Sequence, residues 1–408
     1  MRRVASLVLV VVVGGGFLVE AQVHPTQSRI QPSAPAQWSA ELREAAETFG
    51  VDPENPTSFV RTLARHPAAL NGLAPLAGYI GRGSMVAAYD QALMALRAAW
   101  LCKSNAIWAE GVAEARALGL SDAELRRIAE GPDANWGEWD ATILRATDEL
   151  YRDSAFSDKT WDTLAKRYDA QQLIDIIFTG AEYIMLSMMA NAYGVIPDER
   201  FTDRLPSDVA RTIEAARPTP VRLEHFRLSP IPADEWTDEV RELLDPEGSG
   251  RPTINLYMTL ARHPIFYRPR AVQSAYIRTG ATLSGRAREI LILRIGWLCG
   301  AEYEWAQHVR AARLVGLTEE EIRHIAVGAD APGWDPFDAL LIRATDELHR
   351  DDTISVRTWD ELATRYDERE LIDVVITVAG YRMVSMALNT LGVQLELGRE
   401  GFPDLDVR

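Results

Sequence analysis

Residues 289–308 read EILILRIGWLCGAEYEWAQH, and residues 92–111 read ALMALRAAWLCKSNAIWAEG. In both stretches an apolar run ends in Trp-Leu-Cys, and a short break separates it from a second run with helical spacing. We therefore expect the same helical hairpin twice in one chain. In the second stretch the break falls at Gly300, where the following helix can fold back antiparallel to the preceding one.

The likeness between the two parts of the chain extends beyond this hairpin. LARHP, RATDEL and the stretch GLSDAELRRIA each return in identical or similar form in the second half, the last as GLTEEEIRHIA at 316–326. Repetition over such a length is typical of a duplicated structural unit. We predict a first domain at 37–195, a second at 233–395, and between them a linker at 196–232 that is rich in proline and charge.

Each copy is predicted to be all-helical, because no alternating strand pattern is present. In the second copy a helix is expected over Glu302–Leu314, with Gly316 after its end. Thr318, followed by three glutamates, is typical of the start of the next helix, which should run to Val327. Further helices are expected at about 336–350, 355–366 and 369–392.

The last helix is almost continuously apolar from Leu371 to Val393, with Asp373 and Arg382 inside it. A helix that is apolar on all faces must be buried, here by the other domain or by another subunit. Its length would span a membrane, but the internal charges argue against stable membrane insertion.

The chain has 408 residues and a formal net charge of -16, with no compensating basic stripe. We therefore expect no nucleic-acid partner. At the N-terminus, Arg2 and Arg3 precede a short apolar run and then small residues up to Ala21. This pattern predicts a signal peptide at 1–21 and an exported protein, periplasmic or secreted. An uncleaved tail or a misassigned start is the alternative.

Titratable side chains that could transfer protons occur at these positions in only one of the two hairpins. Glu289, Glu304 and His308 of the second stretch are replaced in the first by Ala92, Ile107 and Gly111. Glu304 and His308 lie four residues apart and share a helix face, and the fold-back at Gly300 would bring Glu289 close to them. Two carboxylates and an imidazole of this kind support proton transfer. The alternatives are an ion pair on a helix surface, or a metal site that lacks a third ligand at a recognisable spacing.

Together with REILILR upstream, the string WLCGAEYEWAQHVRAARLVGLTEEEIRHIA resembles the carboxymuconolactone decarboxylase-like family of the alkylhydroperoxidase D-like superfamily. The resemblance implies two tandem helical domains of that fold. It further implies a homo-oligomer, a trimer that forms a pseudo-hexamer, with sites between helices. The peroxidase branch uses a C-x-x-C pair, but the corresponding positions here are Ala301 and Glu304. Thiol-based peroxide reduction is therefore disfavoured.

The two cysteines, Cys102 and Cys299, follow Trp-Leu in both hairpins and are interpreted as buried scaffold thiols. Arg97 and Arg294 also occur in both copies, which favours a structural salt bridge. Arg382 is present only in the second copy, where the first has Ile184.

We therefore expect one catalytic site per chain, formed by His308, Glu304 and Glu289. Arg382, Tyr303 and Trp305 are candidates for substrate contact, although packing or structural pairing is the alternative for each. The resemblance implies a cofactor-independent carboxy-lyase or isomerase, with no bound metal, that acts on a small carboxylated lactone or related ring compound. A non-catalytic binding or assembly protein and a metal-dependent enzyme are the alternatives.

Overall fold

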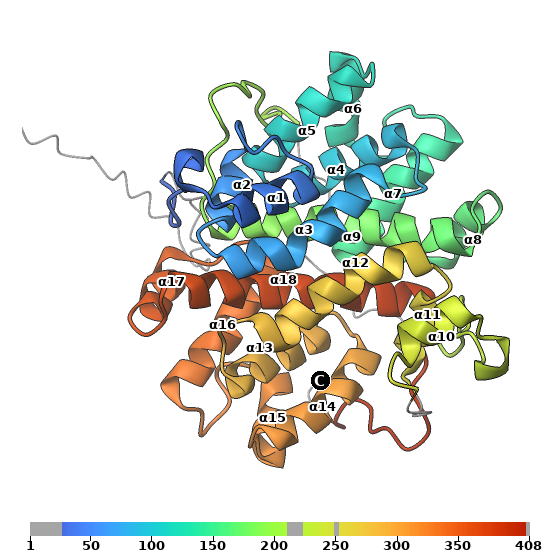
Figure 1. The fold of residues 1–408 in the computed structure, drawn as a ribbon, viewed down its shortest axis with the longest axis vertical. Helices are drawn as coiled ribbons and strands as arrows, with labels where there is room; N and C mark the ends of the chain where they lie inside the picture. The colour runs from blue at the N-terminus through green and yellow to red at the C-terminus, as the bar shows by residue number, and fades with distance from the viewer. Residues whose placement is uncertain (1–26, 210–222, 249–252, 405–408) are drawn as a thin grey trace, which may run out of the picture.

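The computed structural model describes residues 27–209, 223–248 and 253–404. The predicted signal peptide and the middle of the predicted linker lie outside these residues. The described residues form helices joined by loops, with no strand among them, so the all-α prediction is confirmed (Figure 1).

The described part of the N-terminal half contains one short 3₁₀ turn and nine α-helices. Their bounds are η1 Pro35–Gln37, α1 Ala40–Phe49, α2 Ser58–Leu63, α3 Pro67–Arg82, α4 Ala88–Leu101, α5 Asn105–Ala117, α6 Asp122–Glu130, α7 Glu138–Asp153, α8 Asp158–Ala165 and α9 Ala170–Ala192.

The C-terminal half repeats this order and adds a π-helical turn, η3, after α12. Its bounds are η2 Ala233–Glu235, α10 Asp238–Leu244, α11 Asn255–Leu260, α12 Pro264–Ala275, η3 Tyr276–Gly280, α13 Gly285–Leu298, α14 Glu302–Leu314, α15 Glu319–Val327, α16 Pro336–Asp351, α17 Val356–Ala363 and α18 Glu368–Leu391. The helices α4 to α8 match α13 to α17 in length, residue for residue. The duplication and the two-domain division stay predictions.

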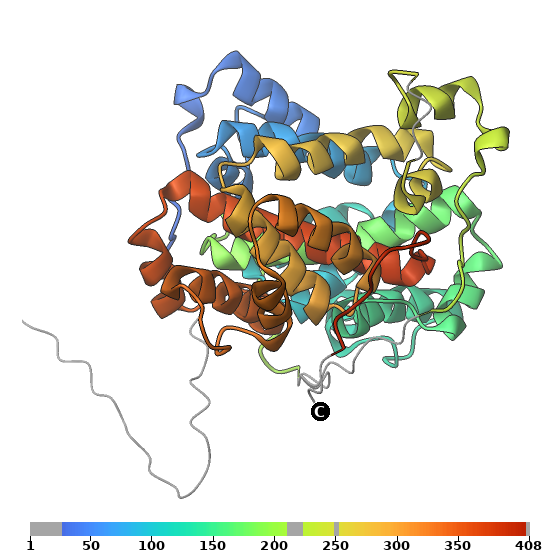
Figure 2. The same ribbon diagram turned by 90° about the horizontal axis from the view of Figure 1, so that it is seen from below.

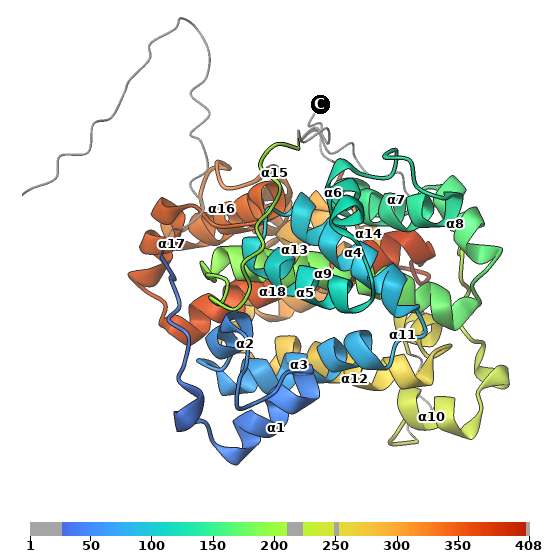
Figure 3. The ribbon, with the colours of Figure 1, turned by 90° about the horizontal axis from the view of Figure 1, so that it is seen from above.

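The helices are stacked in layers around the two long apolar helices α9 and α18, which pack against each other (Figures 2 and 3). Helices α1, α3, α10 and α12 lie on one side of this pair, and α6, α7, α15 and α16 lie on the other (Figure 3). Within the outer layer α3 of the N-terminal half packs along α12 of the C-terminal half. The halves therefore meet twice, through equivalent helices each time.

The described residues include two helices long and apolar enough to cross a membrane, α9 and α18. Their apolar windows are 94% and 100% buried inside this one chain. The continuously apolar character of α18 is therefore explained by burial against α9 and α13, without a second subunit. The trimer prediction consequently rests on the family resemblance alone.

Two buried clusters of the same composition lie where the halves meet. His66, in front of α3, contacts Asp373 of α18 at 3.2 Å, and the Tyr276 hydroxyl donates to the same carboxylate. In the second cluster His263, in front of α12, lies 3.2 Å from Asp175 of α9, to which the Tyr79 hydroxyl donates at 2.8 Å. Each cluster combines residues of both halves, so it fixes how the halves pack.

Candidate active site

The hairpin predicted from the sequence forms as α13 and α14. Helix α13 ends at Leu298, and Gly300 adopts a left-handed conformation with a φ of 61° before α14 begins at Glu302. The N-terminal half makes the same turn with Lys103, whose φ is 59°. The turn geometry is therefore set by the hairpin, and glycine only removes the strain that a side chain adds there.

The fold-back brings the three predicted catalytic residues together, and we call them the acid–base trio. The Nδ1 atom of His308 lies 2.6 Å from Oε2 of Glu289, and its Nε2 atom lies 3.0 Å from Oε1 of Glu304. The side chains are 14%, 3% and 6% exposed for His308, Glu289 and Glu304. The imidazole is therefore held between two nearly buried carboxylates, one on each ring nitrogen.

This arrangement determines the charge of the imidazole. Burial by itself lowers the pKa of His308, but hydrogen bonding and charge attraction from Glu289 and Glu304 outweigh it and raise that pKa to about 9. His308 is consequently an imidazolium at neutral pH. Tyr381 of α18 packs edge-on against the ring, with centroids 4.9 Å apart, and burial raises its pKa well above 10. Its phenol is therefore a potential hydrogen-bond donor to the site.

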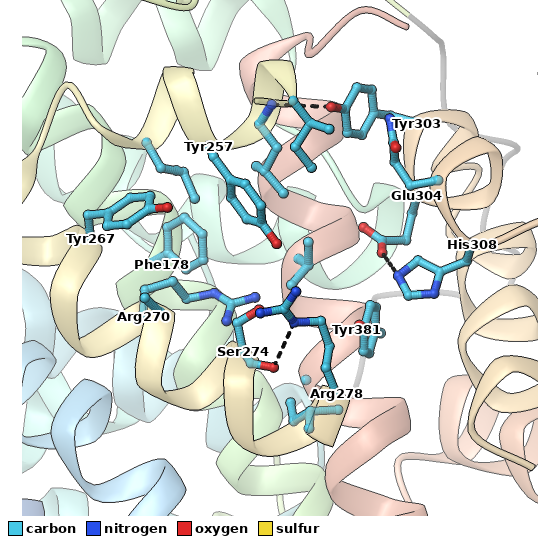
Figure 4. Close-up of a pocket in the computed structure, with 18 residues that line it drawn as sticks. Phe178, Tyr257, Tyr267, Arg270, Ser274, Arg278, Tyr303, Glu304, His308 and Tyr381 are labelled. Carbon is cyan, nitrogen blue, oxygen red and sulfur yellow. Dashed lines mark hydrogen bonds and ion pairs between the residues drawn. The ribbon is translucent and has the colours of Figure 1, made fainter. Parts of the chain in front are cut away.

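The trio lies beside a cavity of about 160 Å³, which Glu304, His308 and Tyr381 line and Glu289 does not. The other walls come from α11, α12, η3 and, in the case of Phe178, from α9 of the N-terminal half (Figure 4). π-Helical turns occur often at functional sites, and η3 contributes Ile277 and Arg278 to this wall.

A further charged side chain, Arg270 of α12, extends into the same cavity (Figure 4). Arg270 is 8% exposed, and its Nε and Nη1 atoms have no hydrogen-bond partner among the described residues. Burial lowers its pKa, although Tyr257, Tyr381, Glu304 and Glu182 favour its charged form. A buried guanidinium with unused donors is suited to hold a carboxylate.

Sequence analysis missed Arg270. The signal was available, because aligning LARHP at 63–67 with LARHP at 260–264 pairs Arg270 with Leu73. Comparing the two copies identified the trio. Extended upstream of α13, the same comparison shows that position 270 also differs between the copies.

The three predicted substrate contacts lie in different places. Tyr303 lines the cavity, and its hydroxyl donates to Glu396 at 2.6 Å. Trp305 is 1% exposed, packs against Trp297 and Phe402, and does not line the cavity. Of the two aromatic residues, only Tyr303 is brought to the trio's cavity.

Arg382 is not brought to the trio either. It is fully buried within α18, and its Nη1 donates to Oδ1 of Asp352 at 2.7 Å. This ion pair replaces Ile184 and Ser154 of the N-terminal half. The structure therefore places Arg382 in the structural pair that was the alternative to substrate contact, and Arg270 is the arginine at the cavity.

The shared residues behave as scaffold. Arg294 pairs with Asp346 and Arg97 with Asp148, each at 2.6 Å. Both guanidinium groups also donate to backbone carbonyl oxygens, those of α15 and α6 respectively. Cys102 and Cys299 are both fully buried, and the Cys299 Sγ lies 4.0 Å from the His349 Nδ1 atom. These thiols are therefore enclosed in the core, away from the cavity lining.

The trio itself offers nitrogen and oxygen donors of the kind that metals accept. In the described parts of the chain, however, no group of three or more His, Cys, Asp and Glu side chains is arranged as a metal site. In the trio each carboxylate contacts a different nitrogen of one ring.

One segment of the chain matches a known protein family. Residues 269–346 match the model of the carboxymuconolactone decarboxylase family. No curated protein matches the chain significantly. The family match runs from α12 into α16 and includes Arg270, Glu289, Glu304 and His308. The segment that carries Arg270 and the acid–base trio is thus similar to the carboxymuconolactone decarboxylase family, within a chain whose described residues form an all-α fold.

Proposed function

We propose that the C-terminal half is a proton-transfer enzyme that acts on a small carboxylated lactone or related ring compound without a cofactor. The observation that carries this proposal is the joint presence, around one cavity, of an imidazolium between two carboxylates and a buried guanidinium with unused donors. The first supplies a proton and a base, and the second supplies a partner for a carboxylate.

The residues then take distinct roles. Glu304 faces the cavity and accepts a proton from a substrate carbon, and His308 returns a proton to the product or intermediate. Glu289 lies behind the ring, outside the cavity lining, and positions the imidazole through Nδ1. If the substrate loses carbon dioxide, the electron pair of the broken C–C bond takes up the proton that His308 delivers. If it isomerises, the same two groups remove and return one proton.

A thermal-shift screen with carboxylated γ-lactones tests the binding part of this proposal. We expect the melting temperature of the wild-type protein to rise with ligand concentration, and Arg270→Met to abolish that rise. Arg278→Gln is the matched control, because Arg278 lines the same cavity but is exposed and donates to the Ser274 carbonyl. Equal shifts in wild type and Arg270→Met would remove the carboxylate-binding role.

Activity tests the chemical part. General acid–base groups contribute about 10² to 10⁴ in rate, so His308→Ala and Glu304→Gln should each lose at least about a hundredfold. Circular dichroism verifies that both variants remain folded. A binding protein without catalysis would show ligand shifts that these two variants leave unchanged, with no turnover in the wild type.

A further inference from the structure

The N-terminal half has a cavity of its own, enclosed by α3, α4, α5 and α9. Its volume is about 510 Å³, compared with about 160 Å³ for the cavity beside the trio. It occupies the equivalent place, because Ala92, Ile107 and Gly111, the counterparts of the trio, line it. Alanine and glycine at two of these positions leave open the space that Glu289 and His308 fill in the other half.

This cavity contains acidic groups that the other one does not have. Glu182 of α9 lines it, is 1% exposed, and has no hydrogen-bond partner for either carboxyl oxygen. The corresponding residue of α18 is Gly380. A buried carboxyl group without a partner destabilises the fold, so its presence at a cavity wall indicates a ligand that satisfies it.

The surroundings of Glu182 are acidic, and burial raises the pKa of Glu110 in the same lining to about 8. Glu110 and Glu114 of α5 also line the cavity, and the Glu110 Oε1 atom is buried without a partner. The basic residue in the lining is Arg82, whose guanidinium is engaged by the backbone carbonyl oxygen of Thr48 at 2.6 Å. When these carboxyl groups lose their protons, they repel an anionic ligand and attract a cation.

Arg270 approaches Glu182 from α12 but does not neutralise it. Burial raises the pKa of Glu182 to about 8, and Arg270 and Gln273 offset only part of that rise. No ion pair within 4.0 Å joins Glu182 to Arg270, both of which lie in the described residues. The carboxyl group of Glu182 is therefore buried in the cavity wall, without an ion-pair partner among the described residues.

We propose that this cavity is a second ligand site, which binds a small primary amine with an apolar body through an ion pair between the ammonium group and Glu182. The apolar walls for the body of the ligand are Phe59, Ile80 and Leu186. No member of the acid–base trio lines this cavity. Below about pH 8, binding releases one proton, because a protonated Glu182 becomes the carboxylate partner of the ammonium group.

Isothermal titration of the full chain with 2-phenylethylamine at pH 7 tests this proposal, with 2-phenylethanol as the uncharged analogue. We expect the amine to bind at least tenfold more tightly than the alcohol. The measured heat should change with the ionisation enthalpy of the buffer, because a proton is released. Glu182→Gln should weaken amine binding at least tenfold, and its unchanged melting temperature would verify the fold.

A second variant tests the location of the site by shape alone. Ala92→Leu fills the space that a glutamate occupies in the other half, so it should also weaken amine binding. His308→Ala is the matched control and should bind the amine as the wild type does, which separates this proposal from that of the proton-transfer site. Absent binding, equal binding of amine and alcohol, or amine binding unaffected by both cavity variants would overturn the proposal.

Discussion

His308 carries a carboxylate on each ring nitrogen, and this geometry makes a prediction about stability. The pKa of His308 is about 9 in the folded chain and near 6.5 when unfolded, so protonation favours the folded state. The stabilisation is complete below about pH 6.5 and is lost as the pH rises through about 9. Its size is on the order of 3 kcal/mol.

Urea denaturation of the wild type and of His308→Gln at several pH values measures this effect. The difference in unfolding free energy between the two proteins should be largest at pH 6 and should shrink towards pH 9.5. His324→Gln serves as the control, since His324 has no carboxylate contact in the described structure. A difference that does not change with pH would contradict the charge state assigned to His308.

The buried ion pair between Arg382 and Asp352 should contribute strongly to stability. Arg382→Ile leaves Asp352 buried without its cation, and removing one partner of such a pair costs about 3–5 kcal/mol. The double variant Arg382→Ile with Asp352→Ser reproduces the Ile184 and Ser154 of the N-terminal half and should recover most of that loss. Chemical denaturation of both variants decides the matter. A double variant as unstable as the single one would show that the pair is not the main contact of Arg382.

Comparing the two copies residue by residue predicted the acid–base trio, because its members are close in the sequence and lie on one hairpin. The same comparison singled out Arg382 and did not extend to Arg270, and it cannot rank one above the other, since both arginines occur only in the C-terminal half. The structure distinguishes them by their surroundings. Arg382 contacts Asp352 at the end of α16, thirty residues away in the sequence, whereas Arg270 lines a cavity. A contact between residues thirty positions apart leaves no pattern in the local sequence around either of them.

Helix ends were predicted well where capping residues mark them. Helices α14 and α15 begin and end at the predicted residues, and Thr318 caps α15 as predicted. The structure adds that Thr318 and Glu321 form a reciprocal capping box. Helix α17 is shorter than predicted and ends at Ala363, where no glycine follows. The packing of α12 along α3 was not predicted, because an apolar face does not specify which helix covers it.

The left-handed turn between α13 and α14 should tolerate a side chain, because the equivalent turn of the other hairpin has one. Gly300→Lys places a side chain in the left-handed conformation that Lys103 already adopts in the other hairpin. The expected destabilisation is about 1–2 kcal/mol, and the contact between Glu289 and His308 should persist. The His308 ring resonances in a pH titration report that contact. A pKa of His308 that returns to about 6.5 in this variant would contradict the view that the hairpin sets the turn.

At the scale of the whole molecule, the halves share their core, so we expect them to unfold together. Calorimetric and van't Hoff enthalpies should agree for the full chain, whereas two independent domains would give a calorimetric enthalpy about twice as large. Asp373→Asn should lower the free energy of unfolding by about 3 kcal/mol and keep a single transition. The reason is that the Asp373 carboxylate accepts hydrogen bonds from Tyr276 and Thr282 and also contacts His66. Glu361→Gln, in an exposed ion pair, should change stability little. Two separate transitions would contradict a shared core.

In the proposed reaction the acid–base trio moves a proton at a carbon atom of a carboxylated ring compound. This proposal is tested most directly by ¹H NMR of carboxylated γ-lactones incubated in D₂O with the wild type, His308→Ala and Arg270→Met. We predict incorporation of deuterium, with or without loss of carbon dioxide, by the wild type, and a rate at least about a hundredfold lower for His308→Ala. Exchange at the same rate in all three proteins, or exchange with none of the compounds, would contradict this proposal.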